Sequence, residues 1–165
     1  MDIKVSSWKV PHIFKIFEAY SVIADARYEK KDNYLLVYSS DYKKRYTVEN
    51  FIDGYASNDN MSYNNGILGY PIVVNLALEG KIYLNRDIAI LFKGINWTDL
   101  NEKCKKDFTL SFETVMAELT NQGIDTKIVR DEVNNVYNQL LLLLPSIGRK
   151  EGNYCYTDSF IHYRN

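Results

Sequence analysis

The chain has 165 residues, of which 46% are hydrophobic and 25% are charged, proportions that are ordinary for a globular protein. A formal net charge of −1 and a sequence pI near 6.1 exclude an overall positive field that would attract nucleic acid or an anionic membrane. We therefore expect one folded domain over residues 1–147 and an aromatic-rich tail over 148–165, either partly docked or mobile.

The first predicted element is an amphipathic helix that begins near Pro11 and ends near Asp25. Its apolar residues recur at three- and four-residue spacings: Val10, Ile13, Phe14, Phe17, Tyr20 and Ala24. Three short segments follow, at 26–30, 34–39 and 45–48, and each is rich in tyrosine or β-branched residues. Turn-forming residues separate these segments, so the pattern predicts an antiparallel meander of three strands.

Residues 51–66 are dominated by glycine, serine, asparagine and aspartate, and their apolar residues follow no period. This composition predicts a long loop without helix or strand. Loops of this length are uncommon in compact domains unless they are mobile or functional. The segment is therefore a candidate lid over any site that folding creates.

About five helices are predicted beyond Gly69, at 71–80, 85–94, 98–106, 107–123 and 125–144. Four of them begin at residue types that cap helices: Asn85, Thr98, Asp107 and Asp125. Glycine closes several of these helices, as expected for a residue that accepts a left-handed conformation. The chain therefore predicts a helix-dominated α+β fold, in which a small three-stranded antiparallel meander near the N-terminus packs on a bundle of about five C-terminal helices.

The last predicted helix ends in five consecutive leucines, which Pro145 terminates. Successive helical residues are rotated by about 100°, so the leucines surround the helix and must be buried by something. Either the helix lies in the core of the domain, or it forms an interface with a second copy or another protein. The residues expected at such an interface are Leu140, Leu141, Leu142 and Leu144.

The predicted meander is the alternative binding surface, because tyrosines alternate there with basic residues as in sheets that stack nucleic-acid bases. The expected contact residues are Tyr34, Tyr38, Lys43, Lys44 and Arg45. Against this interpretation, Leu36 shares one face of the central strand with the two tyrosines, while Leu35 and Val37 occupy the other face. A strand that is apolar on both faces is typical of a buried position, where the tyrosines would belong to the core.

Motifs for catalysis or cofactor binding are missing from the sequence: it has no Gly-rich phosphate loop, no nucleophile turn and no C-x-x-C pair. The two histidines and two cysteines lie at no spacing typical of a metal site. We therefore predict no catalytic residue, no metal ligand and no cofactor. Two distant cysteines without a signal peptide or a membrane-spanning apolar run favour a cytoplasmic location away from membranes.

These patterns favour a small non-enzymatic interaction or regulatory domain that acts through self-association, such as a homodimer, or through binding another protein. Nucleic-acid binding by the meander is the first alternative. The second is a small-ligand binder or an enzyme whose site lies between sheet and helices and is assembled only by folding. A well-formed pocket with convergent polar groups would favour that second alternative.

Overall fold

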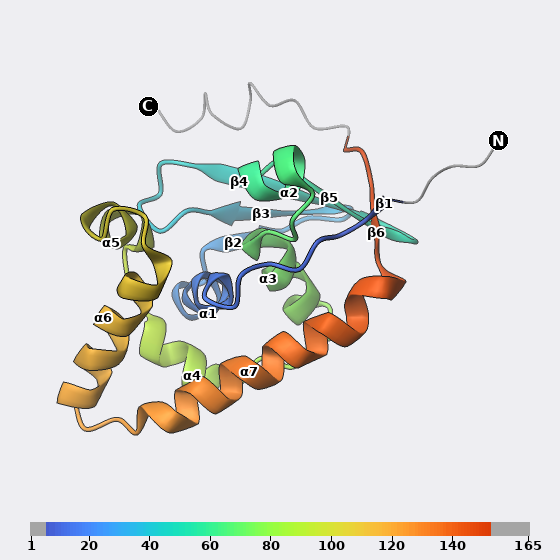
Figure 1. Ribbon diagram of the computed structural model, residues 1–165. Coiled ribbons are helices and arrows are strands. Elements are labelled where there is room, and N and C mark those ends of the chain that lie inside the picture. Colours follow the sequence, from blue (N-terminus) through green and yellow to red (C-terminus); the bar gives the residue numbers. More distant parts are fainter. Residues whose placement is uncertain (1–5, 153–165) are drawn as a thin grey trace.

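The computed structural model describes residues 6–152 and has an α+β architecture (Figure 1). A mixed sheet forms one layer, α1 and α3 lie beneath it, and α7 crosses the far side of α1 (Figure 1). The expected α+β class is therefore confirmed. The predicted C-terminal tail falls largely outside the described residues, and only its first residues are placed.

Helix α1 (Lys15–Asp25) is central to the core and packs against α3, α4 and α7. It begins later than predicted, because Pro11 lies in the irregular segment that precedes the helix. The ring centroid of Phe17 lies 5.1 Å from that of Phe92 and 4.4 Å from that of Phe112. The apolar face predicted from the sequence thus joins elements that are far apart along the chain.

The sheet has six strands among the described residues, in the order β1-β6-β5-β4-β3-β2. Their bounds are β1 (Ser6–Ser7), β2 (Tyr28–Lys30), β3 (Tyr34–Tyr38), β4 (Arg45–Phe51), β5 (Gly54–Ser57) and β6 (Gly148–Arg149). The three predicted strands correspond to β2, β3 and β4, which form an antiparallel meander. The expected three-stranded sheet is nevertheless too small, because β5 extends it and β6 then pairs parallel to β5.

The prediction of a structureless loop at 51–66 is wrong, because this segment contains β5 and helix α2 (Asn60–Asn65). Asp59 caps α2: its carboxylate accepts hydrogen bonds from the Ser62 amide at 3.1 Å and from the Ser57 hydroxyl at 2.5 Å. All three side chains are buried. The polar residues that resembled a loop therefore bond to one another inside the protein, where buried polar groups need partners.

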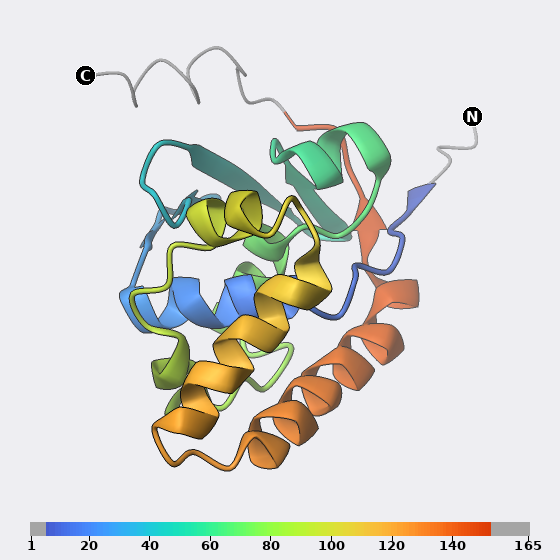
Figure 2. The same ribbon diagram turned by 60° about the vertical axis from the view of Figure 1, so that its left-hand side comes forward.

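Five helices follow, close to the predicted positions: α3 (Tyr70–Leu78), α4 (Arg86–Ala89), α5 (Trp97–Lys103), α6 (Phe108–Asn121) and α7 (Thr126–Leu143). Two 3₁₀ turns, η1 (Ile90–Phe92) and η2 (Leu144–Ser146), extend α4 and α7. Asn85, Asp107 and Asp125 cap their helices as predicted, whereas Asn96 rather than Thr98 caps α5. Helices α6 and α7 diverge from a tight turn at Gly123, which has a φ of +82° (Figure 2).

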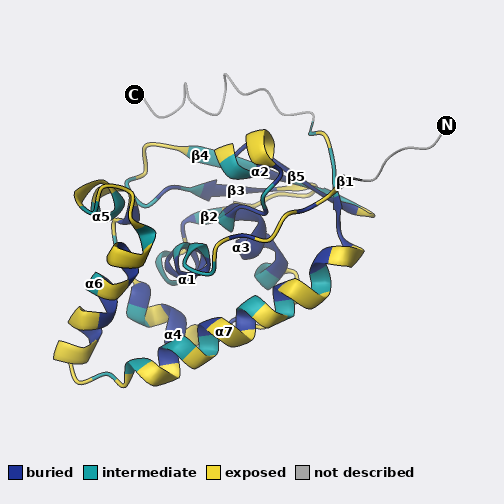
Figure 3. Cartoon of the chain, in the orientation of Figure 1, coloured by how far each residue is buried: buried dark blue, intermediate teal, exposed yellow. Residues whose placement is uncertain are grey.

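Helix α7 buries one stripe and exposes the opposite one (Figure 3). The buried stripe consists of Val129, Val133, Val136 and Leu140. These residues recur every three or four positions, so they lie on the side that faces α1. The helix is thus a cover over the core for most of its length.

Candidate functional site

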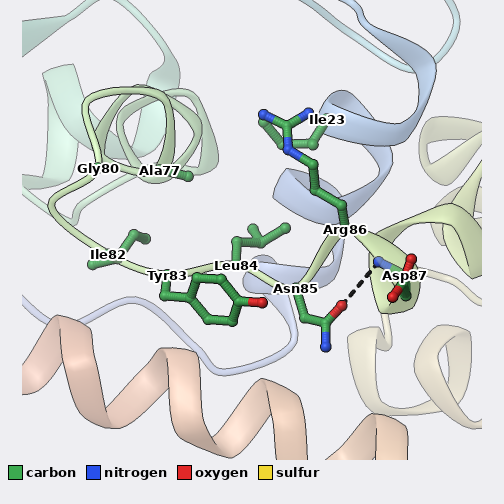
Figure 4. Close-up of a pocket in the computed structure, with 9 residues that line it drawn as sticks. All are labelled: Ile23, Ala77, Gly80, Ile82, Tyr83, Leu84, Asn85, Arg86 and Asp87. Carbon is green, nitrogen blue, oxygen red and sulfur yellow. Dashed lines mark hydrogen bonds between the residues drawn. The ribbon is translucent and has the colours of Figure 1, made fainter.

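A pocket of about 400 Å³ lies between the C-terminal ends of α1 and α3 and the segment that leads into α4 (Figure 4). Its volume is within the range of ligand sites, about 300 to 1,000 Å³. The lining residues are Ile23, Ala77, Gly80, Ile82, Tyr83, Leu84, Asn85, Arg86 and Asp87. The lining is mixed, because the apolar side chains share it with the polar residues Asn85, Arg86 and Asp87.

Local sequence signals shape the wall of this pocket. Gly80 ends the α3 region with a φ of +75°, which suits glycine, and the chain then crosses the molecule as the irregular segment 81–85. Ile82 and Leu84 are buried, whereas the intervening Tyr83 is 65% exposed. The segment bends at Lys81 and Ile82, and the alternation shows that its apolar side chains face the core while Tyr83 faces outward.

Helix α7 holds segment 81–85 from the side opposite the pocket (Figure 4). The Gln139 side chain accepts a hydrogen bond from the Tyr83 amide at 2.7 Å and donates one to the Tyr83 carbonyl at 3.1 Å. Glu132 accepts a third, longer bond from the Asn85 amide at 3.3 Å. The position of this pocket wall therefore depends on two polar residues of α7.

Arg86 supplies the positive charge of the pocket. Its side chain extends beside the hollow toward Ile23, whereas Asp87 points away from it (Figure 4). Within residues 6–152 the Arg86 guanidinium makes no hydrogen bond or ion pair. A guanidinium carries five donors in a planar arrangement that matches a carboxylate or phosphate, so an unpaired one at a pocket is suited to an anion.

A buried hydroxyl lies close enough to Glu132 to be influenced by its charge, and Glu132 is the α7 residue that bonds to Asn85. Tyr20 is on α1, one turn before Ile23, and its hydroxyl has no hydrogen-bond partner within the described chain. Burial, reinforced by the negative charge of Glu132, holds the pKa of Tyr20 well above its usual value. This hydroxyl therefore remains protonated and contributes no negative charge that would oppose an anion in the pocket.

A second polar cluster near the end of α3 is internally satisfied. The Lys81 ammonium donates to the Tyr55 hydroxyl at 2.6 Å, and that hydroxyl donates to Glu79 at 2.7 Å. Asn75 completes the cluster with bonds to Glu79 at 3.0 Å and to Asn50 at 2.7 Å. These bonds connect the end of α3 to Tyr55 of β5 and Asn50 of β4, so we interpret the cluster as structural.

One protein family matches this chain over residues 8–145, under the description Uncharacterised conserved protein UCP014422. The chain belongs to this family. The match includes every residue that lines the pocket, together with Glu132 and Gln139 of α7. No curated protein and no solved structure matches the chain.

The structure divides the four leucines that were expected at an interface. Leu140 and Leu144 are 1% and 6% exposed and belong to the core, so they cannot contact a partner. Leu141 and Leu142 are 41% and 84% exposed on the other side of α7. Of the four predicted leucines, only the second pair is exposed, and the interface interpretation remains a prediction.

The expected nucleic-acid contacts occupy the two ends of β3. Tyr34 is 38% exposed at one end, about 13 Å along the strand from Tyr38. Tyr38 is half-buried and donates to Glu29 at 3.0 Å. Lys43 and Lys44 are exposed in the following turn, and the adjacent Arg45 is half-buried opposite Tyr38. Leu36, between the tyrosines, is buried, and the nucleic-acid interpretation remains a prediction.

Within 6–152, no group of three or more histidine, cysteine, aspartate or glutamate side chains is arranged to hold a metal ion. Among the helices of the same region, none combines the length and the apolar character needed to span a membrane.

The pocket itself was missed by the sequence analysis. Its only local signals are the Gly80 turn and the Asn85 cap, which were interpreted as the end of one helix and the start of the next. Arg86 resembles any charged residue in a first helical turn. The folded structure shows that the Arg86 guanidinium has no partner among the described residues, and the spacing of residues along the sequence cannot show this.

Proposed function

We propose that this protein is a binding domain whose pocket between α1, α3 and α4 takes up a ligand with an anionic group. The single observation that supports this proposal is the unpaired Arg86 guanidinium at a pocket of about 400 Å³. The anionic group accepts hydrogen bonds from Arg86, while the apolar part of the ligand packs on Ile23, Ala77 and Ile82. A hydrogen bond to a charged group contributes about 1.5 to 3 kcal/mol, enough to discriminate against a neutral analogue.

The test is titration of ¹⁵N-labelled protein with inorganic phosphate, benzoate and benzamide, followed by amide chemical shifts. We expect the anions to shift the amides of residues 80–87, with benzoate binding more tightly than benzamide. Arg86→Gln should weaken benzoate binding by about tenfold or more. The matched control is Lys44→Gln, which removes one exposed positive charge from a residue between β3 and β4 that does not line the pocket. Equal benzoate affinity in both variants would contradict the proposal.

Self-association through α7 is a second proposal, and the exposure of Leu142 favours it. A leucine that is 84% exposed, next to one that is 41% exposed, leaves apolar surface in water at the end of a helix. Burying these two side chains against the same pair of a second copy would generate a two-fold dimer.

A further inference from the structure

We propose that the anionic ligand is the C-terminal end of a peptide from another protein, which adds as an extended strand along segment 81–85. This inference rests on the proposed function, since it uses the same pocket and the same Arg86. It goes further by naming the class of ligand and the backbone groups that hold it.

The first observation is an open backbone edge. Gln139 occupies both the amide and the carbonyl of Tyr83 on the α7 side. The amides and carbonyls of Ile82 and Leu84 have no hydrogen-bond partner within residues 6–152. Both residues are buried, at 3% and 7% exposure, and buried backbone groups without partners are rare in proteins. Water or a ligand that both donates and accepts hydrogen bonds is therefore needed beside them.

The second observation is the direction of this edge. The Tyr83 and Asn85 backbones both bond to α7. Backbone groups of successive residues in a non-helical chain point to opposite sides, so those of the intervening Leu84 point away from α7, and those of Ile82, which precedes Tyr83 at a bend, have no partner on α7 either. The pocket lies on that side of the segment, and both residues line it (Figure 4). An extended peptide placed there supplies donors and acceptors at the spacing that an unpaired strand edge requires.

The third observation places the end of the peptide. Arg86 follows segment 81–85 directly, and its unpaired guanidinium borders the same pocket. A main-chain carboxylate can accept two parallel hydrogen bonds from such a group. Capture of a terminal carboxylate beside an added strand is a recurring mode of peptide recognition. The apolar side chains of Ile23 and Ala77 favour an apolar terminal residue.

The experiment uses the full chain and two randomised libraries of short peptides, one with free C-terminal carboxylates and one with C-terminal amides. We expect the free-acid library to bind at least about tenfold more tightly, and Arg86→Gln to remove this preference. Because Arg86 is exposed, this variant should fold normally. Enriched peptides that are N-methylated along the backbone should bind more weakly, since they lose donors to Ile82 and Leu84.

Amide hydrogen exchange provides the second readout. Bound peptide should slow exchange at Ile82 and Leu84 but not at Tyr83, whose amide is already bonded to Gln139. Equal binding of acid and amide libraries would overturn the inference, as would peptide binding without slower exchange at Leu84. A further outcome is that benzoate binds in a manner that depends on Arg86 while peptides bind no more tightly than benzoate. That result would refute the inference that the ligand is a peptide and leave the proposed function intact. If neither class binds, both proposals fail.

Discussion

Asp59 shows how a single buried carboxyl organises the region around α2. It accepts hydrogen bonds from Ser57 and Ser62, and the Ser62 hydroxyl in turn accepts one from the Gly69 amide at 3.0 Å. Burial raises the pKa of Asp59 above its usual value, although the bonds from both serines oppose this effect. The folded state therefore favours the protonated form of this residue more than the unfolded state does.

This preference predicts a pH dependence that can be isolated with Asp59→Asn. A raised folded pKa means that the stabilising contribution is complete below the unfolded pKa of about 3.9 and is lost as pH rises through the folded pKa. Urea unfolding across this range should show the wild-type protein losing stability relative to the neutral variant as pH increases. Parallel stability curves would show that the carboxyl titrates equally in both states.

Gly69→Ala tests how tightly the same carboxyl is packed. A Cβ atom at Gly69 would lie 2.2 Å from Oδ2 of Asp59, a distance that forces the buried side chain to move. We expect the free energy of unfolding to fall by about 3 kcal/mol, the upper range for overpacking. The control is Gly123→Ala, which has a φ of +82° but no atom within 4 Å of the added Cβ. Its backbone strain should cost only about 1 kcal/mol, and equal losses would refute the steric argument.

At the scale of elements, Gln139 joins α7 to the wall of the pocket. Gln139→Ala removes both side-chain bonds to the Tyr83 backbone, and the expected loss of stability is about 1 to 2 kcal/mol. Hydrogen exchange should accelerate at the Tyr83 amide and remain slow within α7. Asn138→Ala, on the exposed side of the same helix, is the matched control and should change neither measurement. Unchanged exchange at Tyr83 would show that Gln139 does not hold the wall.

Elements defined by local interactions could be predicted from the sequence, and those defined by distant contacts could not. Asp107 and Asp125 were identified as caps because a cap acts within one helical turn. Strand β5 pairs with the adjacent β4 and was missed because its glycine and serine resemble loop residues, whereas β6 was missed because its partner β5 lies about ninety residues earlier. The pocket was missed because α1, α3 and α4 line it and α7 holds its wall, so separate parts of the chain contribute to it.

At the scale of the whole molecule, substitutions in α7 test whether the protein self-associates through this helix. Leu142→Asp should leave the fold intact, because that side chain is 84% exposed. Leu140→Asp should abolish folding, because it places a charge at a position that is 1% exposed. Light scattering on a size-exclusion column then measures the assembly. A wild-type dimer that Leu142→Asp converts to a monomer would support the second proposal, whereas a dimer that survives the substitution would rule out this surface.

The pairing of β1 with β6 sets the order of events when the chain is synthesised. Ser6 pairs with Arg149, and the Trp8 indole donates to the Gly148 carbonyl at 3.1 Å. A ribosome must therefore release almost the entire chain before this side of the sheet can close. Until then β5 has an unpaired edge, and an unpaired edge is the part of a sheet that pairs with a neighbouring chain.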